Sequence, residues 1–278
     1  MRHSPIKTRA SEVRSHIKQH KITFAVYVVL RLIVGAMLVL AILRSDYESV
    51  FICGLTLALF LLPAFIQHNL GIRLPTVLEI LILLFIFAAE ILGELQCYYL
   101  HIPFWDEILH TVNGFVCAAV GMALVDLLGG SQHEKFRLSP LYMAIVGFCF
   151  SMTIGVLWEF FEYGMDILFL TDMQKDTVLH TIATVELNPL GENKAIILEN
   201  IRNVTIDGQD LGLGGYLDIG LHDTMGDLIV NFIGAALWGV IGYFYIKHRG
   251  RGAAGQIAEQ FIPTLKEATP DDQPDPSA

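Results

Sequence analysis

Residues 139–167 read SPLYMAIVGFCFSMTIGVLWEFFEYGMDI. The first two thirds of this stretch are almost wholly apolar, and the last third carries Glu159, Glu162 and Asp166. A run of about 18 or more apolar residues with few charges is long enough to cross a bilayer as a helix. The stretch therefore predicts a transmembrane helix whose acidic residues all lie near one end.

Five further runs of the same kind occur in the chain, at about residues 22–43, 49–68, 76–99, 107–128 and 224–246. The composition agrees, because 54% of the residues are hydrophobic and the mean hydropathy is +0.54. Soluble domains contain roughly 45–50% apolar residues. We expect an all-α fold, a polytopic membrane bundle of six transmembrane helices with a small external cap.

The distribution of Lys and Arg predicts the orientation of the bundle. Basic residues gather in the first 21 residues and in the segment after the last helix. Cytoplasmic loops carry an excess of Lys and Arg, so both termini are expected in the cytoplasm. The chain then divides into a basic cytoplasmic N-terminus (1–21), helices one to five (22–167), an external segment (168–222), helix six (223–247) and a partly disordered cytoplasmic tail (248–278).

The external segment is expected to be ordered. Val204, Thr205 and Ile206 form a short β-prone run, and Asp207-Gly208 is a typical two-residue hairpin turn. The segment also contains several Ile and Leu residues. We predict a small cap that contains a β-hairpin.

Acidic residues recur at helical spacing near the outward ends of the predicted helices. Residues three or four apart share one face of a helix. Three such polar stripes continue into small or amide residues: Asp106, His110 and Gly114; Ser151, Gly155, Glu159 and Glu162; Asp223, Asp227 and Asn231. Glu90 and Glu94 end the third apolar run. Ionisable groups within membrane spans usually face the bundle interior, so we expect the stripes to converge on one pocket that opens outward.

The chemistry expected of this pocket follows from its charge. Carboxylates crowded together are either partly protonated or bridged by divalent cations. Oxygen ligands with one imidazole suit Mg²⁺, Mn²⁺, Zn²⁺ or Fe²⁺. The predicted metal ligands are Asp106, His110, Glu159, Glu162, Asp223 and Asp227. Glu159, Glu162 and His110 are the predicted catalytic residues, with Gln174, Lys175 and Asn231 as further candidates.

Four motifs together resemble the YjdF-like family of bacterial inner-membrane proteins over roughly residues 25–246. They are Trp105-Asp106-x-x-x-His110-x-x-x-Gly114, Trp158-Glu159-x-x-Glu162, Asp172-Met173-Gln174-Lys175-Asp176-Thr177 and Asp223-Thr224-Met225-x-Asp227. The resemblance implies a compact polytopic helical bundle and no particular activity. It points to Asp106, His110, Glu159, Glu162, Gln174, Asp223 and Asp227. A fainter similarity, to VanZ-like proteins, implies a function in the cell envelope.

Three functions fit these observations. The favoured one is a metal-dependent hydrolase or transferase that acts on a lipid or envelope precursor at the outer leaflet. The alternatives are a cation- or proton-coupled transporter and a non-catalytic envelope protein that binds lipid or a partner. Membrane lipids are the expected partners, and no nucleic acid is expected.

Overall fold

The computed structural model describes residues 21–129 and 138–265. Within these ranges, six helical segments are long and apolar enough to cross a membrane, which confirms the predicted fold class. They are α2 (Lys21–Leu43), α3 with α4 (Tyr47–Leu59 and Leu62–Asn69), α5 with η1 (Thr76–Ile86 and Phe87–Leu95), α7 (Trp105–Gly129), α8 (Pro140–Phe169) and α9 (Leu221–Lys247). The predicted cytoplasmic N-terminus (1–20) and the end of the tail (266–278) lie outside the described residues.

The chain divides into two compact units. One contains the residues up to Met152 and those from Asn231 onward, and the other is Thr153–Val230. Both α8 and α9 contribute residues to each unit, because the divisions fall inside these helices.

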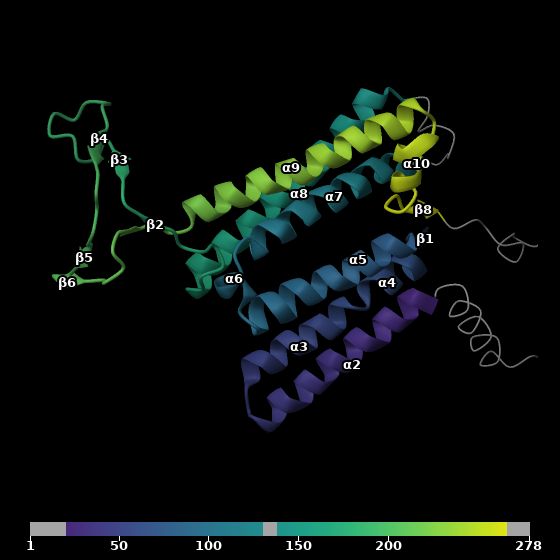
Figure 1. The fold of residues 1–278 in the computed structure, drawn as a ribbon, viewed down its shortest axis with the longest axis horizontal. Helices are drawn as coiled ribbons and strands as arrows, with labels where there is room; N and C mark the ends of the chain where they lie inside the picture. Colours follow the sequence, from purple (N-terminus) through teal and green to yellow (C-terminus); the bar gives the residue numbers. More distant parts are fainter. Residues whose placement is uncertain (1–20, 130–137, 266–278) are drawn as a thin grey trace, which may run out of the picture. The chain divides into compact units, whose positions relative to one another are not determined.

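The described residues of the larger unit form two apolar cores. The first joins α2, α3, α5 and η1, and Figure 1 shows α2, α3 and α5 running alongside one another. Its buried members are Leu30, Val34, Cys53, Phe60, Leu83, Ile86 and Ile91. The second core joins α7 to the first part of α8, the second part of α9 and the short helix α10 (Gly252–Ala258), with Met122, Met143 and Trp238 among its buried residues.

Small residues bring the backbones of α7 and α9 into contact in this unit. A methyl group built on Gly114 would lie 2.2 Å from the carbonyl oxygen of Asn231, and one on Gly234 would lie 2.0 Å from that of Thr111. Such approaches are possible only without a side chain, as at other close-packed membrane helices. Gly114, which continues one of the polar stripes, and Gly234 therefore serve helix packing.

Two of the six spans are not continuous α-helices. The second span is interrupted between α3 and α4. Pro63 stands at the start of α4 and has no N–H group to continue the series of helical backbone hydrogen bonds. In the third, α5 passes into the π-helix η1, which ends before Cys97, whose φ is 56°. The sequence predicted one helix over 76–99; the structure ends it at Leu95 and adds the short helix α6 (Tyr98–His101).

The smaller unit contains the second part of α8, the first part of α9 and the predicted cap between them. Three antiparallel strand pairs form the cap: β2 (Val178–Leu179) with β7 (Tyr216–Leu217), β3 (Ile182–Thr184) with β4 (Ile196–Leu198), and β5 (Thr205–Ile206) with β6 (Gln209–Asp210). Asp207 and Gly208 connect β5 to β6, both with positive φ (52° and 81°). The predicted hairpin is confirmed. In the larger unit, β1 (Ile72–Arg73) pairs with β8 (Thr264–Leu265).

Candidate metal centre

Three buried carboxyl groups meet in the smaller unit. Glu159 and Glu162 lie one turn apart on α8, and Asp227 lies on α9. Each offers one oxygen atom, and these three atoms all lie within 4.8 Å of one another. The exposed fractions of the residues are 4%, 7% and 2%. We call Glu159, Glu162 and Asp227 the carboxylate cluster.

The spacing of the two glutamates explains their placement. Residues i and i+3 share a face of an α-helix, so both side chains leave α8 in similar directions. Trp158 adds a further contact, because its Nε1 donates a hydrogen bond of 2.8 Å to Oε1 of Glu162. Trp158 belongs to the motif Trp158-Glu159-x-x-Glu162, but the sequence gives no sign of this bond.

A second layer of polar side chains surrounds Glu159. The side chains of Gln174 and Thr224 lie close to its carboxyl group, and Asp223 acts on it electrostatically. Nε2 of Gln174 also donates to Oγ1 of Thr224. Gln174 is buried, so its amide is oriented by these contacts rather than by water. The motif predicted Gln174 as a site residue, but it did not indicate Thr224 as its partner.

A short loop carries Gln174 to this position. We call residues 171–177 the strap. Asp166 of α8 accepts three hydrogen bonds from the strap, from Thr171 Oγ1 at 2.8 Å, Met173 N at 2.7 Å and Gln174 N at 2.9 Å. Asp166 is therefore an anchor for the strap.

The other end of the strap is held by α9. The N–H of Lys175 donates to Oδ2 of Asp223 at 2.8 Å. Gly220, with a φ of +84°, leaves room for Gln174, since a methyl group there would lie 2.7 Å from the Gln174 Cβ. The predicted metal ligand Asp223 thus has a structural partner in the strap. The ammonium group of Lys175 donates to the carbonyl of Asp172.

The start of α9 is fixed by a residue that the sequence analysis missed. Asp218 is buried and accepts hydrogen bonds from the N–H groups of Leu221 (3.0 Å) and His222 (2.9 Å). Asp218 lies three residues before α9, and an acidic side chain there can accept hydrogen bonds from the free N–H groups of the first turn, so the pattern offered a signal. By holding the first turn of α9, Asp218 sets the position of Asp223 and Asp227.

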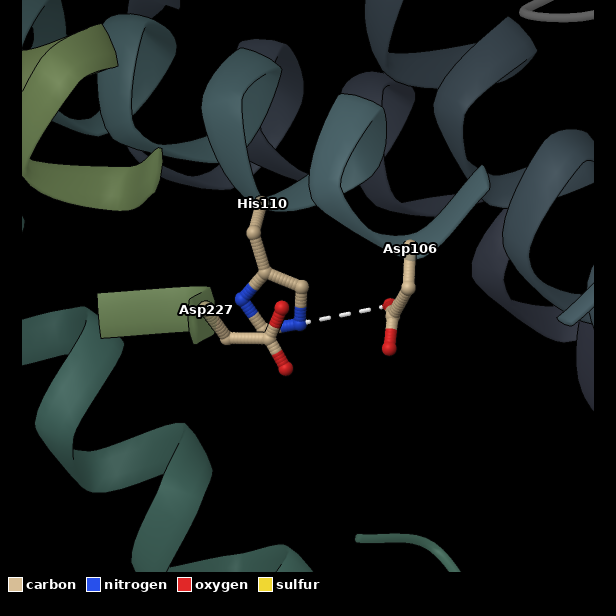
Figure 2. A group of neighbouring side chains, drawn as sticks. All are labelled: Asp106, His110 and Asp227. Carbon is tan, nitrogen blue, oxygen red and sulfur yellow. Dashed lines mark ion pairs between the residues drawn. The ribbon is translucent and has the colours of Figure 1, made fainter. Parts of the chain in front are cut away.

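The remaining predicted site residues belong to the larger unit. Asp106 and His110 lie one turn apart on α7 and form an ion pair of 3.5 Å between Oδ1 and Nε2, which Figure 2 shows as a dashed line. His110 is buried and Asp106 partly exposed. A pocket shared by this pair and the carboxylate cluster stays a prediction. The roles of His110 as a metal ligand and as a catalytic residue also stay predictions.

Asn231 is fully buried in the larger unit. Its Nδ2 lies 3.5 Å from the carbonyl oxygen of Ser151, and Oγ of Ser151 donates to the carbonyl of Gly114 at 2.8 Å. These contacts link α9, α8 and α7 through backbone carbonyl groups. The Asn231 amide therefore contributes to helix packing.

Most of the chain matches a known family. The profile of a family described as "Predicted membrane protein (DUF2238)" matches residues 25–248. The chain belongs to the DUF2238 family. This is the family of the YjdF-like proteins, so the resemblance noted in the sequence is confirmed. No curated protein and no solved structure matches the chain, and the similarity to VanZ-like proteins is not shown.

Proposed function

We propose that this DUF2238 protein is a membrane-embedded, metal-dependent enzyme that acts on a lipid or a lipid-linked envelope precursor. The carboxylate cluster carries this proposal. Three buried carboxyl oxygens within 4.8 Å of one another form a ligand set of hard oxygen atoms. Such a set suits Mg²⁺ or Mn²⁺ best among the divalent cations of cells.

The proposed roles follow from the contacts of each residue. Glu159, Glu162 and Asp227 would hold the ion, and Gln174 with Thr224 would orient Glu159. A bound divalent cation supplies a Lewis acid that polarises a phosphoryl or carbonyl oxygen. Asp223 lies beside Glu159 and is anchored to the strap, so it is a carboxylate of suitable type to accept a proton near the site.

The depth of the cluster favours an amphiphilic substrate. Asp227 lies less than two helical turns after the first residue of α9, and Glu162 lies about two turns before the end of α8. With a rise of about 1.5 Å per residue, these positions are roughly 10 Å from the helix ends, near the boundary between headgroups and acyl chains. A phosphate or ester of a lipid lies at this level.

Lipid turnover by the reconstituted protein tests the function. The full-length protein is incorporated into vesicles of total bacterial lipid extract, incubated with Mg²⁺ or Mn²⁺, and the lipids are compared by mass spectrometry. We expect the wild-type protein to consume one lipid class. This turnover should stop when a chelator is added, and it should be absent in Glu159→Gln. Glu186→Gln, an exposed acid of the cap, is the matched control. Unchanged lipids, or turnover that survives both treatments, would refute the enzyme.

The proposed orientation is that both termini are cytoplasmic and the cap lies outside an inner membrane. The basic residues in the sequence before Lys21 and after Lys247 support this. Reporter fusions after residue 250 should report cytoplasm, and fusions near residue 190 should report the outside. An outside signal at residue 250 would reverse the orientation and place the cluster at the inner leaflet.

A further inference from the structure

A basic side chain lies in the middle of the first span. Arg31 is near the centre of α2 (Lys21–Leu43) and is exposed at the surface of the structure. Its exposed neighbours on the helix are apolar: Val28, Val29, Leu32 and Ile33. In a membrane this face of α2 meets acyl chains, where an arginine costs about 2.5–3.5 kcal/mol on insertion scales.

The contacts of Arg31 reveal the direction of its side chain. Its guanidinium carbon lies 4.5 Å from the ring centroid of Tyr27, one turn earlier in α2. Long side chains on a helix point toward its N-terminus, and here the guanidinium extends toward the Lys21 end. It therefore lies closer to the membrane surface than its backbone does.

The other contact is a carbonyl at the break in the second span. Nη2 of Arg31 lies 3.5 Å from the oxygen of Phe60, and the hydroxyl of Tyr27 donates to the same oxygen. Phe60 directly follows α3, where the helical ladder is interrupted. Both side chains thus stabilise a backbone group inside the bilayer.

This carbonyl does not compensate the positive charge. A guanidinium has five N–H donors, and a neutral acceptor at 3.5 Å uses one of them weakly. Among residues 21–129 and 138–265, no carboxylate forms an ion pair with Arg31. Glu79 of α5 acts electrostatically on Tyr27, so an acidic residue also lies near this site.

We propose that Arg31 and Tyr27 form a binding site for the phosphate group of an anionic phospholipid. The planar guanidinium matches phosphate oxygens with two parallel hydrogen bonds. The lipid would come from the leaflet at the Lys21 end of α2, toward which the side chain points. Charge complementarity favours an anionic lipid, because the sequence contains Arg14 and Lys18 before this helix, Lys21 is its first residue, and Arg73 stands in β1.

Lipid-dependent stabilisation of the full-length protein tests this site. The purified protein in mild detergent is titrated with phosphatidylglycerol or phosphatidylcholine, and thermal unfolding and native mass spectrometry report binding. We expect phosphatidylglycerol to bind the wild-type protein more tightly, and Arg31→Gln to weaken that binding about tenfold or more. Arg44→Gln, at the other end of the same helix, should leave it unchanged.

Control measurements distinguish the phospholipid from other ligands of this site. Inorganic phosphate alone should not stabilise the protein, since it lacks the acyl chains. If phosphate did stabilise it, the ligand of this site would be a free anion and not a lipid. Dimerisation lost in Arg31→Gln would instead assign the site to a second copy of the chain. Equal binding of both lipids to the wild-type protein would overturn the proposal even if Arg31→Gln failed to fold. Unchanged phosphatidylglycerol binding by Arg31→Gln would also overturn it.

Discussion

The two parts of helix α9 use the same helical face for different purposes. Up to Val230 the face carries Asp223 and Asp227, and side chains and loop N–H groups contact it. From Asn231 onward it carries Gly234, whose backbone touches the Thr111 carbonyl of α7. Both parts show the same periodicity in the sequence. Residue chemistry therefore decides whether a buried face in a membrane helix forms a site or a packing contact.

Overfilling the packing part should produce the largest effect. Gly234→Val places carbon atoms where the Thr111 carbonyl lies, so α7 and α9 must separate. Overpacking typically costs roughly 1–3 kcal/mol and occasionally more. We expect little folded protein by size-exclusion chromatography in detergent. Gly239→Ala on the same helix, where no atom lies within 4 Å, should purify like the wild type. Equal yields of both variants would show that backbone contact is not what this part of α9 contributes.

Loosening the strap should have an intermediate and local effect. Asp166→Asn removes a charged acceptor from three hydrogen bonds, each worth about 1.5–3 kcal/mol when an ion is involved. We expect faster hydrogen exchange at the N–H groups of Met173 and Gln174, with the helices unaffected. Asp172→Asn in the same loop is the control, since its carboxylate makes none of these bonds. Unchanged protection in Asp166→Asn would mean that the strap is held mainly by α9.

The smallest effect concerns pH. Partial desolvation, followed by the neighbouring Asp172 and Asp218, raises the pKa of Asp176 in the cap. Its folded pKa lies above its unfolded value, so protonation favours the folded state. Its stabilising contribution is full below the unfolded pKa and is lost as pH rises through the folded pKa. In Asp176→Asn the free energy of cap unfolding should change less with pH than in the wild type. The difference should be about 0.5 kcal/mol or less, because the residue is exposed. If the unfolding free energy of the variant fell more steeply with rising pH than that of the wild type, the pKa of Asp176 would be lowered in the folded state and not raised.

The sequence predicted those features that depend on periodicity and local turn chemistry. Six apolar runs became six helical spans, and Asp207-Gly208 became a hairpin turn. The burial of Glu159, Glu162 and Asp227 also followed from the helical spacing. These predictions succeeded because each rests on neighbours within one or two turns.

Other features were not predictable, because they join residues distant in sequence. The bond from Lys175 to Asp223 spans 48 residues, and the contact of Gln174 with Thr224 spans 50. No local pattern indicates which loop N–H meets which carboxylate. The π-helix η1 was also missed, since its residues show the same apolar run as an α-helix. The contact of Arg31 with the Phe60 carbonyl likewise joins residues 29 positions apart and is visible only in the fold.

Metal-linked stability tests the central claim most directly. Protein freed of metal by a chelator is titrated with Mg²⁺, Mn²⁺ or Zn²⁺ while thermal unfolding is followed. We predict stabilisation that grows with concentration, reaching about 2.7 kcal/mol at 100 times the Kd. It should disappear in Glu159→Gln, Glu162→Gln and Asp227→Asn and remain in Glu186→Gln. A melting temperature that ignores all three ions, in a wild-type protein that instead becomes more stable as pH falls, would contradict the metal centre and indicate a protonated cluster.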